Sequence, residues 1–196
     1  MQAETGFAVR PAEPGDWAAV AAVMDTPGDP RRCWCQYFLL RGQAWSGAAR
    51  EDLRAALHDQ VSAGDRPGLV AYDAATPVGW VQVGPKASYP RLASSAISRE
   101  PGGAADPDGL WALTCFVVPR PHRRSGVAHA LLRAAVAYAA GQGAALLEAY
   151  PVDTDAGPAS AAELYHGSLA MYRAAGFAEV RRPAPRRAVV RLTLAG

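Results

Sequence analysis

The fold is decided by one continuous stretch, LWALTCFVVPRPHRRSGVAHALLRAAVAYAA, which spans residues 110 to 140. Its first part, residues 110–118, is an apolar run of strand length, which is typical of a strand buried on both faces. A turn follows over residues 119–125. From Gly126 to residue 140, apolar side chains recur at helical spacing, which predicts a helix. The repeating positions are Val127, Leu131, Ala134 and Tyr138.

The N-terminus of this helix has the features of an anion-binding site. A helix leaves about four of its first backbone N–H groups without a partner inside the helix, and its dipole places partial positive charge there. Gly126 has no side chain to keep an anion away, and Arg123 and Arg124 add positive charge. The pattern predicts a site for a pyrophosphate group. The alternative is an ordinary strand-to-helix turn with surface arginines, because every basic residue except Lys86 is an arginine.

Strands and helices alternate on both sides of this stretch. The patterns predict strands over residues 7–11, 69–72, 78–83, 144–150, 177–180 and 188–194. They predict further helices over residues 16–24, after Ser46 as a capping residue, and over residues 169–175. Because both kinds of element occur throughout, we expect a single α/β domain over residues 1–196.

One long segment, residues 84–109, shows no pattern and is rich in proline, serine and glycine. Loops longer than roughly 12–15 residues are usually functional or disordered. We therefore expect this segment to cover the acceptor site or to be partly mobile.

Composition limits the classes of protein. The chain of 196 residues is 50% hydrophobic, which excludes a disordered tail, and its net charge of +2 predicts no nucleic-acid partner. No apolar run approaches the roughly 20 residues of a membrane span, and no leader is recognisable at the start. The three cysteines cannot all pair, so we expect reduced thiols and a cytoplasmic location. The histidines are scattered, which predicts no metal site.

Several motifs in this order resemble the GNAT superfamily of acyl-CoA-dependent N-acyltransferases. Its signature, Arg/Gln-x-x-Gly-x-Gly/Ala, is matched by Arg123, Gly126 and Ala128. A second signature places a tyrosine four residues before a Gly-Phe pair, and Tyr172 with Gly176-Phe177 matches it. The opening 9-VRPA-12 and the hairpin segment 77-PVG-79 are similar to the family as well.

The resemblance implies the GNAT fold and its cofactor. The expected sheet is mixed, mostly antiparallel and strongly twisted, with six to seven strands, about four flanking helices and a split between the fourth and fifth strands. Acetyl-CoA would enter that split as the acyl donor. Backbone groups of Phe116, Val117 and Val118 would bond its pantetheine arm. The predicted pyrophosphate site comprises Arg123, Arg124, Ser125, Gly126, Val127 and Ala128.

The resemblance also implies a reaction, the direct attack of a primary amine on the thioester in a ternary complex. Tyr172 is the expected donor to the departing thiolate; the alternative is a core tyrosine beside Phe177. Glu148 lies in an otherwise apolar strand, where burial would make it a proton acceptor. The alternatives are a glutamate satisfied by an arginine or by backbone amides, one on an exposed edge, or a base at Asp153, Asp155 or His166.

The acceptor is expected to be a small-molecule amine. Its predicted contacts are Trp34, Tyr37, Trp80, Tyr150 and Asp153. The acidic loop at Asp153 and Asp155 favours a cationic amine, and the aromatic residues favour an apolar body, while a hydrophobic core role for Trp34 and Trp80 is the alternative. A homodimer is common in the family. A different class of function, an acyl-CoA-binding sensor without turnover, fits the same cradle, as does an enzyme that uses a longer acyl chain.

Overall fold

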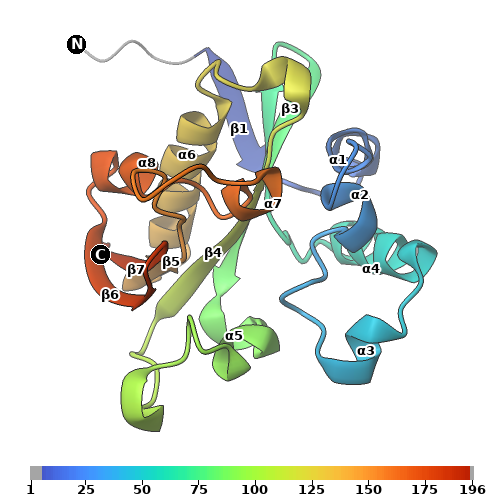
Figure 1. Cartoon of the computed structure of the whole chain (residues 1–196). Coiled ribbons are helices and arrows are strands. Elements are labelled where there is room, and N and C mark those ends of the chain that lie inside the picture. The colour runs from blue at the N-terminus through green and yellow to red at the C-terminus, as the bar shows by residue number, and fades with distance from the viewer. Residues whose placement is uncertain (1–5, 195–196) are drawn as a thin grey trace.

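The computed structural model describes residues 6–194 and contains one seven-stranded sheet (Figure 1). The strand order is β1-β2-β3-β4-β5-β7-β6, and every neighbouring pair is antiparallel except the parallel pair β4–β5. The strands are β1 Phe7–Pro11, β2 Leu69–Asp73, β3 Thr76–Pro85, β4 Leu110–Val117, β5 Leu146–Ala149, β6 Ala178–Ala184 and β7 Arg187–Thr193. The predicted mixed, mostly antiparallel sheet of six to seven strands is confirmed.

The sheet splits where β4 carries a bulge. On the β3 side, Gln82 pairs with Cys115 but Val83 pairs with Leu113, which leaves Thr114 as an extra residue. On the β5 side, pairing runs from Leu110 to Leu113 and then stops. A bulge bends its strand and ends regular pairing, so β4 leaves β5 at this residue. The predicted split between the fourth and fifth strands is therefore present.

The described residues contain eight α-helical segments, more than the four that we expected. The predicted helices correspond to α1 Trp17–Met24, α4 Arg50–Ala63, α6 Val127–Gly141 and α8 Leu169–Ala174. The additional segments are single turns of four or five residues: α2 Pro30–Cys33, α3 Gly42–Ser46, α5 Pro90–Ser94 and α7 Ala161–Leu164. Such turns carry too little periodicity to be read from a sequence. Ser46 ends α3, and Ala49 rather than Ser46 precedes α4.

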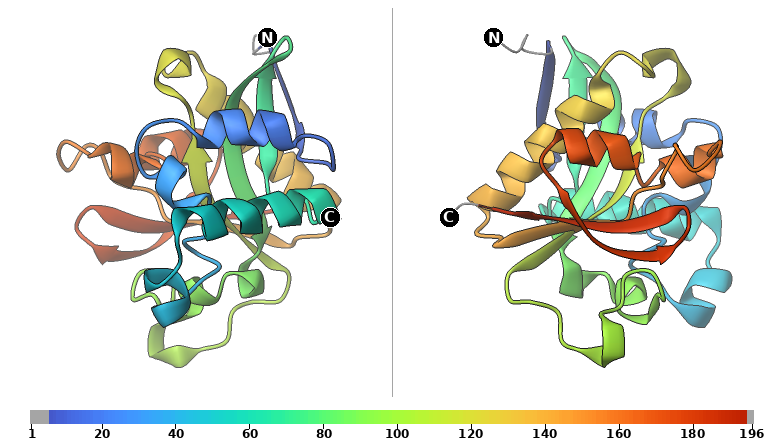
Figure 2. Two further views of the ribbon diagram at one scale, coloured as in Figure 1. Left: turned by 90° about the vertical axis from the view of Figure 1, so that its right-hand side faces the viewer. Right: turned by 60° about the vertical axis from the view of Figure 1, so that its left-hand side comes forward.

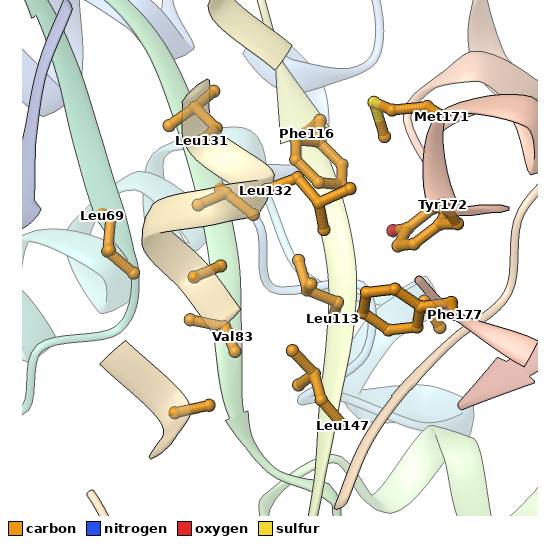
Figure 3. Close-up of a cluster of buried hydrophobic side chains, with 14 of the residues drawn as sticks. Leu69, Val83, Leu113, Phe116, Leu131, Leu132, Leu147, Met171, Tyr172 and Phe177 are labelled. Carbon is orange, nitrogen blue, oxygen red and sulfur yellow. The ribbon is translucent and has the colours of Figure 1, made fainter. Parts of the chain in front are cut away.

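Helices cover both faces of the sheet (Figure 2). On one face, α6 and α8 enclose the larger core, whose central side chains include Leu131, Leu132 and Phe177 (Figure 3). On the other face, α1 and α4 pack over a second core that contains Leu57 and Trp80. No helix within residues 6–194 combines the length and apolarity needed to cross a membrane.

Residues 84–109 are folded against the sheet. They contain α5 and two short 3-10 turns, η1 Lys86–Ser88 and η2 Pro101–Gly103; a third, η3 Arg120–His122, follows β4. Tyr89 and Leu92 are buried in a small core with Ala112 of β4, Val189 of β7 and Tyr150, which follows β5. The buried Lys86 ammonium donates to the Ser98 carbonyl at 2.9 Å and to Asp106 at 2.6 Å. These contacts tie the segment to itself and to the sheet.

Candidate active site

The helix start after β4 presents free backbone donors. Gly126 has a φ of 94° and Arg124 a φ of 64°, both in the left-handed region that turns the chain sharply into α6. The first hydrogen bond of the helix runs from the Ala130 amide to the Gly126 carbonyl at 3.0 Å. Among residues 6–194, no group of the chain accepts a hydrogen bond from the backbone amides of residues 124–128. These amides and the helix dipole together form an anion cradle.

The cradle opens into a cleft of about 530 Å³. The predicted cofactor residues that line it are Phe116, Val118, Arg123, Arg124, Gly126, Val127 and Ala128. Ser125 does not line it, and its hydroxyl donates to the His122 carbonyl at 2.6 Å. The Arg123 side chain braces the turn, because its Nε donates to the Val118 carbonyl at 2.9 Å.

The free edge of β4 faces a segment from much later in the chain. The Phe116 amide donates to the Tyr165 carbonyl at 2.7 Å, and the Thr114 carbonyl accepts from His166 Nδ1 at 3.1 Å. Backbone groups of alternate strand residues point to the same edge. Val117, which pairs with Trp80 on β3, therefore points its amide and carbonyl away from the split. Val117 also does not line the cleft.

Tyr172 lies beside this edge. Its ring is fully buried and makes edge contacts with Phe116 and Phe177 at centroid distances of 6.3 and 5.1 Å (Figure 3). Among residues 6–194, the hydroxyl has no hydrogen-bond partner, and burial raises the pKa of the Tyr172 phenol well above its usual value. The phenol is thus protonated at physiological pH and has an unused donor. The ring packs in the core beside Phe177, as the alternative expected, and the lining of the cofactor cleft includes Met171 but not Tyr172.

Glu148 has a different environment from the one expected of a free base. Its fully buried carboxylate accepts from Arg191 Nε at 2.7 Å and from the Tyr150 hydroxyl at 2.6 Å, and it pairs with Lys86 Nζ at 3.0 Å. Arg191 also pairs with Glu100. These contacts match the alternative in which an arginine satisfies the glutamate, and a lysine contributes a second positive charge. The carboxylate lines neither the cofactor cleft nor the second pocket described below.

A second pocket of about 540 Å³ lies on the other side of Tyr165, which lines both cavities. Of the predicted acceptor contacts, only Tyr37 lines it. Trp34 and Trp80 are buried in the core beneath α1 and α4, which was the alternative reading. Asp153 pairs with Arg182 at 2.7 Å near β6.

Sequence reasoning missed much of this pocket. Its other contributors include Arg32, Trp45, Thr114, Cys115 and Tyr165. Thr114 and Cys115 precede the predicted cofactor residues on one strand, and this adjacency was a usable signal. No local pattern indicates Tyr165, because only the tertiary fold brings it to β4. Among the described residues, no group of three or more histidine, cysteine, aspartate or glutamate side chains is arranged to hold a metal ion.

His166 lines this pocket with a defined tautomer. A carbonyl oxygen only accepts, so the contact with Thr114 requires the proton on Nδ1 and leaves Nε2 with a lone pair. The imidazole ring packs edge-on against the Phe38 ring, with 5.8 Å between the ring centroids. Burial, assisted by the nearby Arg187 cation, lowers the pKa of His166 to about 4. The imidazole is therefore neutral across the physiological range.

This depressed pKa predicts a pH dependence of stability. Because the unfolded chain binds the His166 proton near pH 6.5 and the folded chain only near pH 4, stability is full above 6.5 and falls as the pH decreases towards 4. Urea unfolding of the wild type and of His166→Gln between pH 7.5 and 4.5 measures the effect. The wild type should lose more stability on acidification than the variant. Parallel curves would contradict the assignment.

A split mixed sheet with an anion cradle at the helix after β4 has the features of the acyl-CoA N-acyltransferase fold. A sequence model of the acetyltransferase (GNAT) family matches residues 34–177, and the chain belongs to that family. No curated protein sequence matches the chain.

Solved structures share the fold at low sequence identity. The PaiA N-acetyltransferase from Thermoplasma acidophilum, solved with coenzyme A, is 11% identical with a TM-score of 0.54, over 95% of this chain and 98% of that one. YncA from Salmonella typhimurium, solved with its cofactor acetyl-CoA, is 13% identical with a TM-score of 0.55, over 97% and 95%. A GNAT-family acetyltransferase from Streptococcus pneumoniae is 17% identical with a TM-score of 0.51, over 96% and 99%.

Proposed function

We propose that this protein is an acetyl-CoA-dependent N-acetyltransferase. One observation carries the proposal: the free amides of residues 124–128 stand at the end of a cleft that follows the unpaired edge of β4. A pyrophosphate on these amides would direct a pantetheine arm along that edge towards Tyr172. The coenzyme A and acetyl-CoA in two of the similar structures support this choice of donor.

The edge of β4 offers the pantetheine arm a small set of partners. Phe116 and Val118 would contribute the backbone groups, with Val117 excluded because its groups face β3. The Phe116 amide already donates to the Tyr165 carbonyl. Cofactor binding therefore requires the Tyr165 carbonyl to give up this bond or the arm to use the Val118 amide and the Phe116 carbonyl. Arg124, with no side-chain partner among the described residues, would meet a phosphate oxygen.

In the reaction, the neutral amine of the acceptor attacks the thioester carbonyl. The new C–N bond forms, the C–S bond breaks, and a proton leaves the nitrogen while the thiolate takes one up. Tyr172 would donate a hydrogen bond to the departing sulfur, since its hydroxyl is protonated and unpaired. This is a direct transfer within a ternary complex.

For the group that receives the amine hydrogen, we propose His166 instead of Glu148. The Nε2 lone pair of His166 belongs to the pocket next to the split, while the Glu148 carboxylate is engaged by two cations. With a pKa of about 4, His166 would accept a hydrogen bond from the neutral amine and orient it, without removing a proton from an ammonium ion.

We further propose that residues 1–196 act as one domain in the cytoplasm, on a small-molecule amine, with a homodimer as the assembly common in the family. The three free thiols agree with a reducing compartment.

The cradle is tested by deleting one of its amides. Ala128→Pro removes the donor at a position in the first helical turn where proline is tolerated, and Ala128→Ser keeps it. We expect calorimetry to show coenzyme A binding at least about tenfold weaker for Ala128→Pro, and near wild type for Ala128→Ser, because a charge-assisted hydrogen bond is lost.

Thiol release with an amine library then separates an enzyme from a sensor. Release by the wild type supports the enzyme. Binding of acetyl-CoA without thiol release for any amine would favour the acyl-CoA sensor, and no binding at all would overturn both.

A further inference from the structure

The pocket across Tyr165 has a floor beside the split and aromatic walls. Thr114, Cys115 and His166 form the floor, next to the edge of β4 that the thioester would reach. In the wall, the Tyr37 ring packs edge-on against Phe38 and Trp45, with centroid distances of 5.0 and 5.2 Å. This arrangement suits an acceptor whose amine reaches the floor and whose apolar or aromatic body lies against the wall.

The aromatic wall is held in place by an arginine that does not itself line the pocket. Arg91 lies over the Tyr37 ring at 4.1 Å, and its side chain donates to the Tyr37 carbonyl at 2.5 Å and to the Leu40 carbonyl at 2.6 Å. Arg91 therefore acts as a brace. Any charge recognition has to come from the rim of the pocket.

The rim carries one arginine with a free guanidinium. Arg50 lines the pocket but is paired with Asp25 at 3.0 Å, and Arg31 beside it is paired with the same carboxylate at 2.9 Å. Arg32 also lines the pocket, and within residues 6–194 its side chain has no hydrogen bond or ion pair. Asp29 is the carboxylate on this rim.

The cations that line the pocket therefore outnumber its anions, with Arg32 and Arg50 set against Asp29. His166 on the floor is neutral and adds no negative charge. Glu148, Asp153 and Asp155 do not line the pocket. A polycationic acceptor would meet like charge here, whereas a carboxylate would find the planar donor fork of Arg32.

We propose that the acceptor is a primary amine whose apolar or aromatic body ends in a carboxylate, and that Arg32 binds this carboxylate. The inference rests on the proposed acetyltransferase function and names its substrate class. The acetyl carbon leaves sulfur for the acceptor nitrogen, the amine proton is lost and the thiol is formed; the carboxylate takes no part in bond making. The expected preference opposes the cationic amine that the acidic loop favoured in the sequence.

The experiment compares compounds that differ only in the carboxylate. Phenylalanine and glycyl-phenylalanine place it at two distances from the amine, and phenylalaninamide and glycyl-phenylalaninamide replace it by a neutral amide. Spermidine serves as the polycation. We expect kcat/KM, measured by thiol release from acetyl-CoA, to be at least about tenfold higher for one acid than for its amide, and to be lowest for spermidine. Calorimetry in the presence of coenzyme A should show the same order of binding.

Arg32→Gln should reduce the acid-to-amide ratio to within about twofold. The control is Arg99→Gln, which removes the same charge from an exposed arginine outside the pocket and should keep the ratio. Equal kcat/KM values for acid and amide, or an unchanged ratio in Arg32→Gln, would overturn the inference. The proposed acetyltransferase function would still stand in that case, because the protein would still turn over an amine. Coenzyme A binding with no acid bound or acetylated would overturn it too. Loss of coenzyme A binding would instead overturn the proposed function.

Discussion

Replacing Tyr172 by phenylalanine is expected to lower kcat about 100-fold or more, as for the loss of a positioned proton donor, and to leave the Kd of coenzyme A near the wild-type value. The substitution removes only the hydroxyl, which donates to no group in the described part of the chain, and keeps the ring against Phe116 and Phe177. Since a buried unpaired hydroxyl is costly, Tyr172→Phe should be as stable as the wild type or more stable. Stopped assays of thiol release and thermal unfolding measure both effects.

The chain supplies a matched control in Tyr150. This tyrosine is also buried, but its hydroxyl donates to Glu148 at 2.6 Å. Tyr150→Phe should therefore lose stability and keep most of kcat, the reverse of the result at Tyr172. An unchanged kcat in Tyr172→Phe would show that Tyr172 is only a core residue. The departing thiolate would then have no proposed hydrogen-bond donor from this chain.

Substitution of Glu148 by glutamine should cost stability far more than catalysis. The carboxylate neutralises Lys86 and Arg191, and Lys86 is only 3% exposed. Removal of one partner from a buried ion pair typically costs about 3–5 kcal/mol. We expect about 3 kcal/mol, the lower end of that range, because Asp106 and Glu100 remain as partners. Urea unfolding measures this loss.

The kinetic result decides the role of Glu148. At a temperature where the variant stays folded, kcat of Glu148→Gln should lie within a few-fold of the wild type. Asp106→Asn, which alters the half-exposed partner of Lys86, should cost less stability. A fall in kcat of about 100-fold at nearly unchanged stability would restore Glu148 as the base.

The geometry of the proposed cofactor half of the site was largely predictable because it is local in sequence. The strand, the turn and the helix start lie within residues 110–140, and the left-handed Gly126 and the free amides follow from those residues alone. The prediction failed at Val117, because the bulge at Thr114 decides which backbone groups face the split. A bulge depends on pairing with β3, which no local pattern contains.

The proposed acceptor half was poorly predictable because it is assembled from distant segments. Aromatic side chains in 33-CWCQYF-38 looked equivalent in sequence, yet Trp34 is buried in the core and Tyr37 lines the pocket. Asp153 was attractive as an exposed acid, but Arg182 on β6 neutralises it. Which of several similar side chains meets the cavity depends on packing between elements.

The amino-acid sequence by itself indicated the family through its matched motifs. It also predicted the strands, the four longer helices and the anion cradle, since periodicity and glycine conformation act over a few neighbouring residues. Only the tertiary structure decided what lies beside the split. It brought Tyr165 and His166 to the edge of β4, buried Tyr172 with a free hydroxyl and joined Glu148 to Lys86. The physical reason is that burial and charge pairing are properties of contacts between segments far apart along the chain.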